Sequence, residues 1–165
     1  MTTAHHAHET GAYVLHPGQG RAVPVPHAGG QLTMKAEQHQ TGGLITMYES
    51  QHEPHSVGPA RHYHDRWTEL FYVLDGTFTF LVGEQIHRAP AGTTVVIPPR
   101  TIHAFHNAED EPARILVMVL PAGFEGFFDA ARDLVSPATD AVRWQHINET
   151  WDQHVVGPPL GSRTA

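Results

Sequence analysis

Three histidines and one glutamate are spaced in this sequence so that they could bind one metal ion. His62 and His64 are two residues apart, and Glu69 and His103 follow further along the chain. On a strand, residues two apart share a face, with Cα atoms roughly 6.5 Å apart. Imidazoles at that spacing can converge on one ion about 2 Å from each nitrogen. Glu69 has the wrong parity for the same face, so we expect a bend or bulge within residues 65–67.

The residue types limit which ion such a site would take. Imidazole nitrogens and a carboxylate suit Fe(II), Mn(II), Co(II), Ni(II), Cu(II) or Zn(II), and they suit Ca(II) and Mg(II) poorly. The sequence contains no cysteine, so disulfides, thiol nucleophiles, thiolate-bound zinc and iron–sulfur clusters are excluded. We expect one divalent transition metal per chain. The protein ligands would leave a coordination position open on that ion, and catalysis by a metal ion requires such a position for the substrate or a water molecule.

Length, charge and hydropathy exclude other classes of protein. A chain of 165 residues forms one ordinary domain. The net charge of -7, from 17 acidic and 10 basic residues, argues against nucleic acid as a partner. Residues 1–11 lack the basic and apolar regions of a signal peptide, and no run of apolar residues is long enough to cross a membrane. We therefore expect a cytoplasmic protein that does not bind membranes.

The hydrophobic pattern divides the chain into three parts. Residues 1–21 are polar and have no hydrophobic period, which predicts a flexible arm that settles onto the domain around residues 13–15. The arm carries His5, His6 and His8, a tract that we expect to bind transition metals only weakly. Residues 22–120 are all-β in pattern, and residues 121–165 predict a helical extension that packs on the β domain.

Short runs of β-branched and aromatic residues between glycines and prolines predict the strands of the middle part. These runs are residues 44–49, 69–74, 77–82, 93–97, 103–107 and 115–120. Strands at this spacing favour a sandwich or a barrel. Asp75-Gly76 predicts a two-residue hairpin turn between two of the runs, and Gly83-Glu84 predicts a second turn.

Two helices are predicted after Pro121. Residues 124–135 carry apolar side chains at helical spacing, with acidic and basic residues on the opposite side. Asp140 could cap a second helix, whose weaker apolar stripe extends to Val155 before the Gly-Pro-Pro sequence at residues 157–159. We interpret the aromatic residues of the first helix as packing against the β domain.

Two stretches of the chain resemble the two motifs of the cupin family. Residues 62–76 fit the first motif, G(X)5HXH(X)3-4E(X)6G, from its first histidine to its last glycine, and residues 92–107 resemble the second, G(X)5PXG(X)2H(X)3N. The resemblance spans roughly residues 58–107 and implies an all-β jelly-roll barrel. It also implies that the metal ligands are His62, His64, Glu69 and His103.

The resemblance assigns structural roles to other motif positions as well. It implies turn glycines at Gly76 and Gly92, a strand that opens at Pro98, and a motif that ends at Asn107. The chain departs from the family pattern at two positions. Ser56 stands where the first motif begins with glycine, and Gly58 is displaced from that position by two residues.

Arg100 is the second departure, because it replaces the inner glycine of the second motif. It could hold an anionic substrate or form a surface salt bridge. We expect an apolar wall for a planar ligand from Phe71, Val73 and Phe105, which have the strand parity of Glu69 or His103. His106 and His87 are expected to be structural, since His106 points away from the face of His103 and His87 follows a turn.

A barrel of this kind followed by the segment PAGFEGFFDAARDLV resembles the small bacterial monocupins described as quercetin-2,3-dioxygenase-like. The resemblance implies metal-dependent oxidative cleavage of a flavonol or a similar enol-bearing small molecule by O₂, with Glu69 as the catalytic base. One alternative is a non-redox cyclase or isomerase with a polyketide-type substrate, and another is a small-molecule binding or sensor protein. The resemblance also implies a homodimer.

Overall fold

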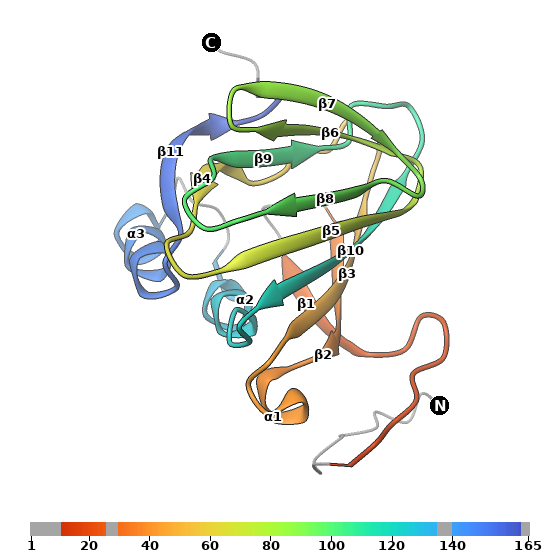
Figure 1. Cartoon of the computed structure of the whole chain (residues 1–165). Helices are drawn as coiled ribbons and strands as arrows, with labels where there is room; N and C mark the ends of the chain where they lie inside the picture. Colours follow the sequence, from red (N-terminus) through yellow and green to blue (C-terminus); the bar gives the residue numbers. More distant parts are fainter. Residues whose placement is uncertain (1–10, 26–29, 135–139, 163–165) are drawn as a thin grey trace.

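Two antiparallel sheets face each other and enclose the interior of the protein (Figure 1). The computed structural model describes residues 11–25, 30–134 and 140–162. The first sheet has the strand order β1-β2-β3-β10-β5-β8, and the second has the order β11-β4-β9-β6-β7. The strands are β1 (Arg21–Val25), β2 (Gly30–Ala36), β3 (Thr46–His52), β4 (Ala60–Tyr63), β5 (Thr68–Asp75), β6 (Thr77–Val82), β7 (Gln85–Pro90), β8 (Thr94–Ile97), β9 (His103–His106), β10 (Ala113–Leu120) and β11 (His154–Pro159). The chain crosses repeatedly between the sheets, which confirms the predicted jelly roll.

The strands that the sequence predicts are present as β3, β5, β6, β8, β9 and β10. β4 lies outside these runs, although the spacing of His62 and His64 indicated a strand there. The sequence missed β1, β2, β7, β11 and the short helix α1 (Gln38–Thr41). Of the missed strands, β1, β7 and β11 are sheet edges. Their apolar alternation is weak: β1 contains Pro24, and Ala89 is the buried position of β7. An edge strand pairs on one side and meets water on the other, so its sequence carries little hydrophobic signal.

The predicted hairpin at Asp75-Gly76 is wrong. β5 pairs with β10 and β8, whereas β6 pairs with β7 and β9, so the strands on either side of Gly76 lie in different sheets. Gly76 has a φ of 70°, and a Cβ atom there would come within 2.7 Å of the Pro112 carbonyl oxygen. Glycine at this corner lets the chain pass from one sheet to the other. The predicted turn at Gly83 does form a hairpin, between β6 and β7.

The C-terminal part is less helical than the sequence predicts. Helix α2 covers Glu125–Ala131 and helix α3 covers Ala141–Thr150, and the chain then forms β11. Val142 and Val155 of the predicted apolar stripe are 85% and 46% exposed, whereas Ile147 is buried. The end of the predicted stripe is instead a strand, because β11 pairs with β4 and adds an edge to the second sheet. The division of the chain at residues 21 and 120 stays a prediction, and the histidines at positions 5, 6 and 8 lie outside the described residues.

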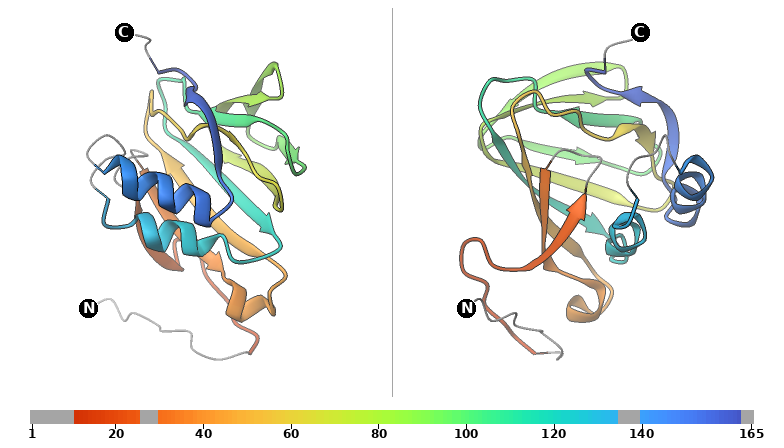
Figure 2. Two further views of the ribbon diagram at one scale, coloured as in Figure 1. Left: turned by 90° about the vertical axis from the view of Figure 1, so that its left-hand side faces the viewer. Right: turned by 180° about the vertical axis from the view of Figure 1, so that it is seen from behind.

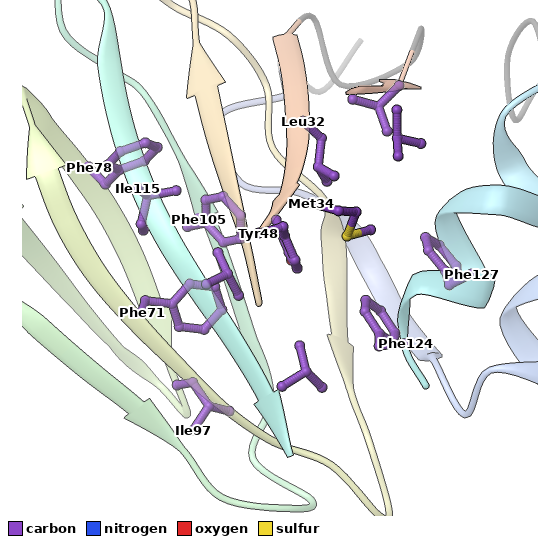
Figure 3. Packing of buried hydrophobic residues seen from close by; sticks show 14 of the residues in the cluster. Leu32, Met34, Tyr48, Phe71, Phe78, Ile97, Phe105, Ile115, Phe124 and Phe127 are labelled. Carbon is purple, nitrogen blue, oxygen red and sulfur yellow. The ribbon is translucent and has the colours of Figure 1, made fainter. Parts of the chain in front are cut away.

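The core fills the space between the sheets with side chains that alternate inward along each strand. Figure 3 shows Phe71 of β5 and Ile115 of β10 close to Phe78 and Phe105 of the second sheet. The ring centroids of Phe71 and Phe105 are 5.3 Å apart, and those of Phe78 and Phe105 are 5.9 Å apart. Aromatic pairs in these tilted arrangements add to the stability gained from burying their apolar surface.

The helices continue this core beyond the strands. Figure 2 shows α2 and α3 side by side, with α2 next to β1. The Phe124 and Phe127 rings stack at a centroid distance of 5.2 Å, and Phe128 meets Tyr48 of β3 edge-on at 5.0 Å. These contacts hold α2 over the interior of the barrel. Among the residues described, no helix has the length and apolar character needed to cross a lipid bilayer.

Gly58, just before β4, lies very close to the backbone of β9. A Cβ atom at Gly58 would lie 1.6 Å from the backbone oxygen of Phe105 on β9. Because the clashing atoms belong to the backbone, the added methyl group forces one of the two segments to shift. We predict that Gly58→Ala lowers the free energy of unfolding by about 3 kcal/mol, the upper range for an overpacked site. Urea unfolding at equilibrium measures this loss.

Gly11→Ala is the matched control for this substitution. A Cβ atom at Gly11 would meet nothing within 4 Å, and its φ lies outside the left-handed region. We expect the control to unfold at the same urea concentration as the unmodified protein. Equal midpoints for both variants would contradict the close approach of Gly58 to β9.

Candidate metal centre

The predicted ligands come from three strands of two sheets. His62 lies on β4, His64 directly follows it, and His103 begins the neighbouring strand β9, where it pairs with His62. Glu69 lies on β5 in the facing sheet. One nitrogen or oxygen atom from each side chain lies within 4.8 Å of the corresponding atoms of the others, and all four residues are buried. The four side chains therefore converge on one point inside the barrel.

The predicted bend between His64 and Glu69 is present, at residues 65 and 66. From the sequence we expected this bend to bring Glu69 to the same face of one strand, but the bend also carries the chain into the other sheet. The chain leaves β4 of the second sheet at the bend and enters β5 of the first sheet, so the Glu69 carboxylate approaches the histidines from the opposite wall. A ligand set built from both walls encloses its centre, which a set from one strand could not do.

Backbone carbonyl groups fix the orientation of all three imidazoles. The Nδ1 atoms of His62, His64 and His103 lie 2.7, 2.8 and 3.0 Å from the carbonyl oxygens of Ala60, Asp152 and Thr101. A carbonyl oxygen can only accept a hydrogen bond, so each Nδ1 carries the proton. The Nε2 lone pairs are then left to face the centre in the neutral rings, which is the arrangement in which imidazoles bind metals.

Two contacts inside the cluster require a cation or a proton. His103 Nε2 and Glu69 Oε2 are 2.6 Å apart, and both are acceptors when the ring is neutral and the carboxylate ionised. His64 Nε2 is buried without a hydrogen-bond partner and lies 3.6 Å from the same oxygen. An unsatisfied buried polar atom costs about 1–3 kcal/mol. A divalent ion would satisfy both contacts, so these residues fit a metal.

His62 and Glu69 have the protonation states of metal ligands. Burial, followed by the charges of His103 and His64, lowers the pKa of His62 to about 3, so this ring is neutral at neutral pH. Burial alone would raise the pKa of Glu69, but its contacts with His103 and His64 hold the pKa well below its ordinary value. A neutral imidazole and an ionised carboxylate are the forms that bind a metal. Burial would lower the pKa of His64, but the hydrogen bond and charge of Glu69 outweigh burial and raise that pKa, so a proton on this ring competes with a metal.

Asp152 supports the site from the C-terminal part of the chain, and the sequence analysis missed it. Its carbonyl oxygen accepts the hydrogen bond from His64, and its carboxylate Oδ2 accepts the backbone N–H groups of Asp65 and Arg66 at 3.0 and 2.9 Å. Asp152 adopts a φ of 52° at the turn between α3 and β11. No sequence signal marked it, because the pattern predicted a helix there.

The motif residues that do not bind metal hold the loops around the site. Asn107 is fully buried, and its amide nitrogen donates to the carbonyl oxygens of Glu53 and Glu111 at 3.1 and 2.8 Å. Its side-chain oxygen accepts the backbone N–H of Glu109 at 3.0 Å. Gly92 has a φ of 87°, which only glycine adopts without strain.

A cavity of about 280 Å³ adjoins the cluster between the two sheets and the helices. His62 and Glu69 form part of its wall, and most of the remaining wall is apolar. Its aromatic residues are Tyr48, Phe105, Phe124, Phe127, Phe128 and Trp144. Polar side chains also reach it from Ser50, His52 and Gln153, and among the described lining residues none is a lysine or an arginine. The cavity is therefore suited to an uncharged, flat ligand.

Of the four residues that the sequence placed at the substrate pocket, one lines the cavity and three do not. Phe105 lines the cavity, whereas Phe71 and Val73 lie in the core, with 1% and 0% of their surface exposed, and do not reach it. Arg100 is a surface residue whose Nε lies 2.9 Å from Asp65 Oδ1. Its φ of 65° explains why the motif has glycine at this position. The structure shows the salt bridge of Arg100 and places the residue outside the cavity wall, and its binding of an anionic substrate stays a prediction.

The two histidines expected to be structural lie outside this cavity. His106 ends β9 and pairs with Thr79 of β6. His87 is exposed on the edge strand β7, opposite Phe80. Neither side chain is part of the cavity wall or of the metal-binding group.

Comparison with known proteins places the chain among proteins with this fold. Residues 49–119 match the model of the cupin domain family. The chain is 30% identical over 123 residues to quercetin 2,3-dioxygenase from Bacillus subtilis (strain 168), and the match covers 73% of the chain and 35% of the relative. The chain thus spans about a third of the length of this relative.

Solved structures with low sequence identity share the same architecture. A predicted oxalate decarboxylase from Thermotoga maritima superimposes with a TM-score of 0.60 at 15% identity, over 66% of this chain and 99% of the other. The polyketide cyclase RemF from Streptomyces resistomycificus does so with a TM-score of 0.57 at 18% identity, over 66% and 79%. The two superpositions show the shared fold. The match over residues 49–119 and the similarity to the Bacillus subtilis relative show that the chain is a small member of the cupin superfamily.

Proposed function

We propose that this protein is a metal-dependent dioxygenase that cleaves or oxidises a flavonol-like or enol-bearing small molecule. His62, His64, Glu69 and His103 would hold one divalent transition metal, whose identity is left to experiment. The observation that carries the proposal is the aromatic cavity, which has two of these side chains, His62 and Glu69, in its wall.

The size and lining of the cavity favour an uncharged aromatic substrate. An apolar cavity of about 150 Å³ holds benzene, so a cavity of about 280 Å³ accommodates more than one aromatic ring. Flat rings stack well against Phe124 and Phe105, which line the cavity. A sugar phosphate needs cationic side chains for its phosphate group, and the described wall offers neither lysine nor arginine for it. Oxalate could bind the metal but would leave the aromatic wall unused.

The residues of the site would divide the chemistry between them. A bound transition ion would act as a Lewis acid for an enol oxygen and would provide a site for O₂. Glu69 is ionised and faces the cavity, so it can accept the proton of the substrate hydroxyl. The three Nδ1–H···O=C hydrogen bonds keep the imidazoles fixed during this transfer. Substrate is oxidised and O₂ is reduced, with no further reductant.

Two comparisons bear on the choice of reaction. The relative in Bacillus subtilis is named as a quercetin 2,3-dioxygenase, which supports an O₂-dependent reaction. The RemF structure is that of a polyketide cyclase, and a polyketide would also fit an aromatic cavity. The second candidate is therefore a non-redox cyclase, and the requirement for O₂ distinguishes the two.

The first experiment measures metal content and O₂ consumption. We predict about one transition metal per chain after purification without a metal-affinity step, and little metal in His103→Ala. Replacing His5, His6 and His8 by alanine in both proteins removes adventitious binding by the arm. Elemental analysis gives the metal content, and an oxygen electrode with quercetin gives the turnover of protein reconstituted with each candidate ion.

His87→Ala is the matched control, because His87 is exposed and lies outside the metal-binding group. It should retain both metal and turnover. Metal-loaded protein that converts an aromatic substrate under strict anaerobiosis would favour the cyclase. A protein that binds no metal even after reconstitution would overturn both enzyme functions and leave a ligand-binding barrel.

The role of Glu69 as a base has its own test. We predict that Glu69→Gln keeps the metal at an affinity lowered by about 10-fold to 100-fold, and that it loses at least 100-fold in turnover. The amide preserves the shape of the side chain but cannot accept a proton. Metal titration and O₂ consumption measure the two effects. Glu84→Gln, in the exposed β6–β7 turn, is the control and should change neither the metal affinity nor the turnover. Wild-type turnover in Glu69→Gln would exclude Glu69 as the catalytic base.

The outer face of the first sheet supports a homodimer as part of this proposal. Met47, Met118, Leu70 and Val96 are cross-strand neighbours in one row over four strands. All four point away from the core, and Val96 is 51% exposed. In a two-fold symmetric dimer the same surface of both copies forms the interface, so this apolar row would be covered by the same row of a second copy.

We predict that light scattering after size-exclusion chromatography gives twice the chain mass of 18.2 kDa. Met118→Lys should give the single-chain mass, because it places a charge in the middle of the row. Ile86→Lys adds the same charge at an exposed position of β7 and should leave the dimer intact. A single-chain mass for the unmodified protein would reject this interface.

A further inference from the structure

The cavity has a second polar region, which the proposed metal centre does not use. Ser50 and His52 lie on the inner face of β3, and both line the cavity although they are 9% and 3% exposed. The Ser50 hydroxyl lies 3.1 Å from His52 Nε2, and the Ser56 hydroxyl lies 3.3 Å from His52 Nδ1. These three side chains form a short hydrogen-bonded chain that ends at the cavity.

This region is separated from the metal ligands by the length of a small ligand. Ser50 pairs with Ile115 of β10, which pairs with Val73 of β5. Val73 is four residues beyond Glu69, which corresponds to roughly 13 Å along a strand. The Phe105 ring lies between the two regions, because it contacts His52 at 5.5 Å and stands two residues after His103. A flat molecule in the cavity can therefore have one end at Glu69 and the other at Ser50.

The hydrogen-bonding chemistry of the region suits a hydroxyl group. Burial lowers the pKa of His52 to about 4, so the ring is neutral and has one donor and one acceptor nitrogen. When Ser50 donates to His52 Nε2, the serine oxygen can accept a hydrogen bond from a ligand. When the imidazole tautomer is reversed, His52 donates to Ser50, and the serine proton is free for a ligand. Ser50 can thus match a group that both donates and accepts.

Packing around His52 limits what else these polar groups can do. The rings of Phe78 and Phe105 meet the imidazole edge-on at 5.2 and 5.5 Å. Among the described residues, the side-chain hydrogen bond of Ser50 is the one to His52, although a hydroxyl can form three. The remaining hydrogen-bonding capacity of Ser50 faces the cavity, most of whose wall is apolar.

We propose that Ser50, backed by His52, is a distal specificity site that binds a phenolic hydroxyl at the end of the substrate away from the metal centre. This inference rests on the proposed function and adds a requirement to it. The preferred substrate carries an enol-type oxygen at one end and a hydroxyl at the other. A ligand with only the enol end would occupy the same cavity but bind less tightly.

Two flavonols test the site by direct binding. Quercetin carries hydroxyls on its outer rings, whereas 3-hydroxyflavone has the same enol and ketone pair without them. Protein loaded with Zn(II) binds without redox chemistry, so dissociation constants can be measured by fluorescence quenching in the absence of turnover. We expect the unmodified protein to bind quercetin about fivefold to tenfold more tightly than 3-hydroxyflavone. This ratio of dissociation constants corresponds to the net contribution of one hydrogen bond between uncharged groups.

Ser50→Ala should abolish this preference and leave the affinity for 3-hydroxyflavone unchanged, which also shows that the variant is folded and loaded. Thr150→Val is the control, because it removes an exposed hydroxyl that donates to the His146 carbonyl oxygen on α3, and neither residue lines the cavity. It should keep the preference.

The outcomes separate this inference from the proposed function. If quercetin keeps its advantage in Ser50→Ala, or has none in the unmodified protein, the distal site is overturned while flavonol binding stands. If the Zn(II)-loaded protein binds neither flavonol, the proposed substrate class fails, and the distal site fails with it.

Discussion

The buried carboxylate of Glu69 is the constraint on which the rest of the structure depends. An ionised group inside a barrel loses its hydration, at a cost of several kcal/mol unless partners compensate it. A proton or a metal ion held between Glu69 and the rings of His103 and His64 supplies that compensation, and His62 completes the ring of donor atoms around the centre. Each imidazole is held in turn by a backbone carbonyl group. The charge is therefore stable in the core only because two sheets and the C-terminal segment are in place together.

This dependence explains why the C-terminal part belongs to the site. Asp152 holds the His64 ring with its carbonyl oxygen and the bend after His64 with its carboxylate. β11 pairs with β4 and so ties the same segment to the strand of His62. Helices α2 and α3 add aromatic side chains to the cavity wall. A segment that lies outside both cupin motifs thus completes the centre and shapes what can approach it.

The chemistry of the cavity and that of the centre complement each other. The centre offers a carboxylate and imidazole nitrogens, while the cavity offers flat apolar walls with Ser50 and His52 beyond Phe105. An uncharged aromatic molecule with oxygen atoms at both ends uses all of these features. A small anion would use only the centre and leave the aromatic wall without a function.

The sequence by itself determined the β class, six of the strands and the residues of the centre, because alternation and the HXH spacing are local and the cupin motifs are contiguous. It placed Phe71 and Val73 at the cavity by parity alone, and it missed Asp152, Ser50 and His52. Parity gives the face of a strand but not the distance along the barrel or the partner across it. Whether residues 75–76 turn a hairpin or a corner, and which segment meets His64, depends on pairings between distant strands. Those pairings are decided by the packing of the whole barrel, so only the tertiary structure could show them.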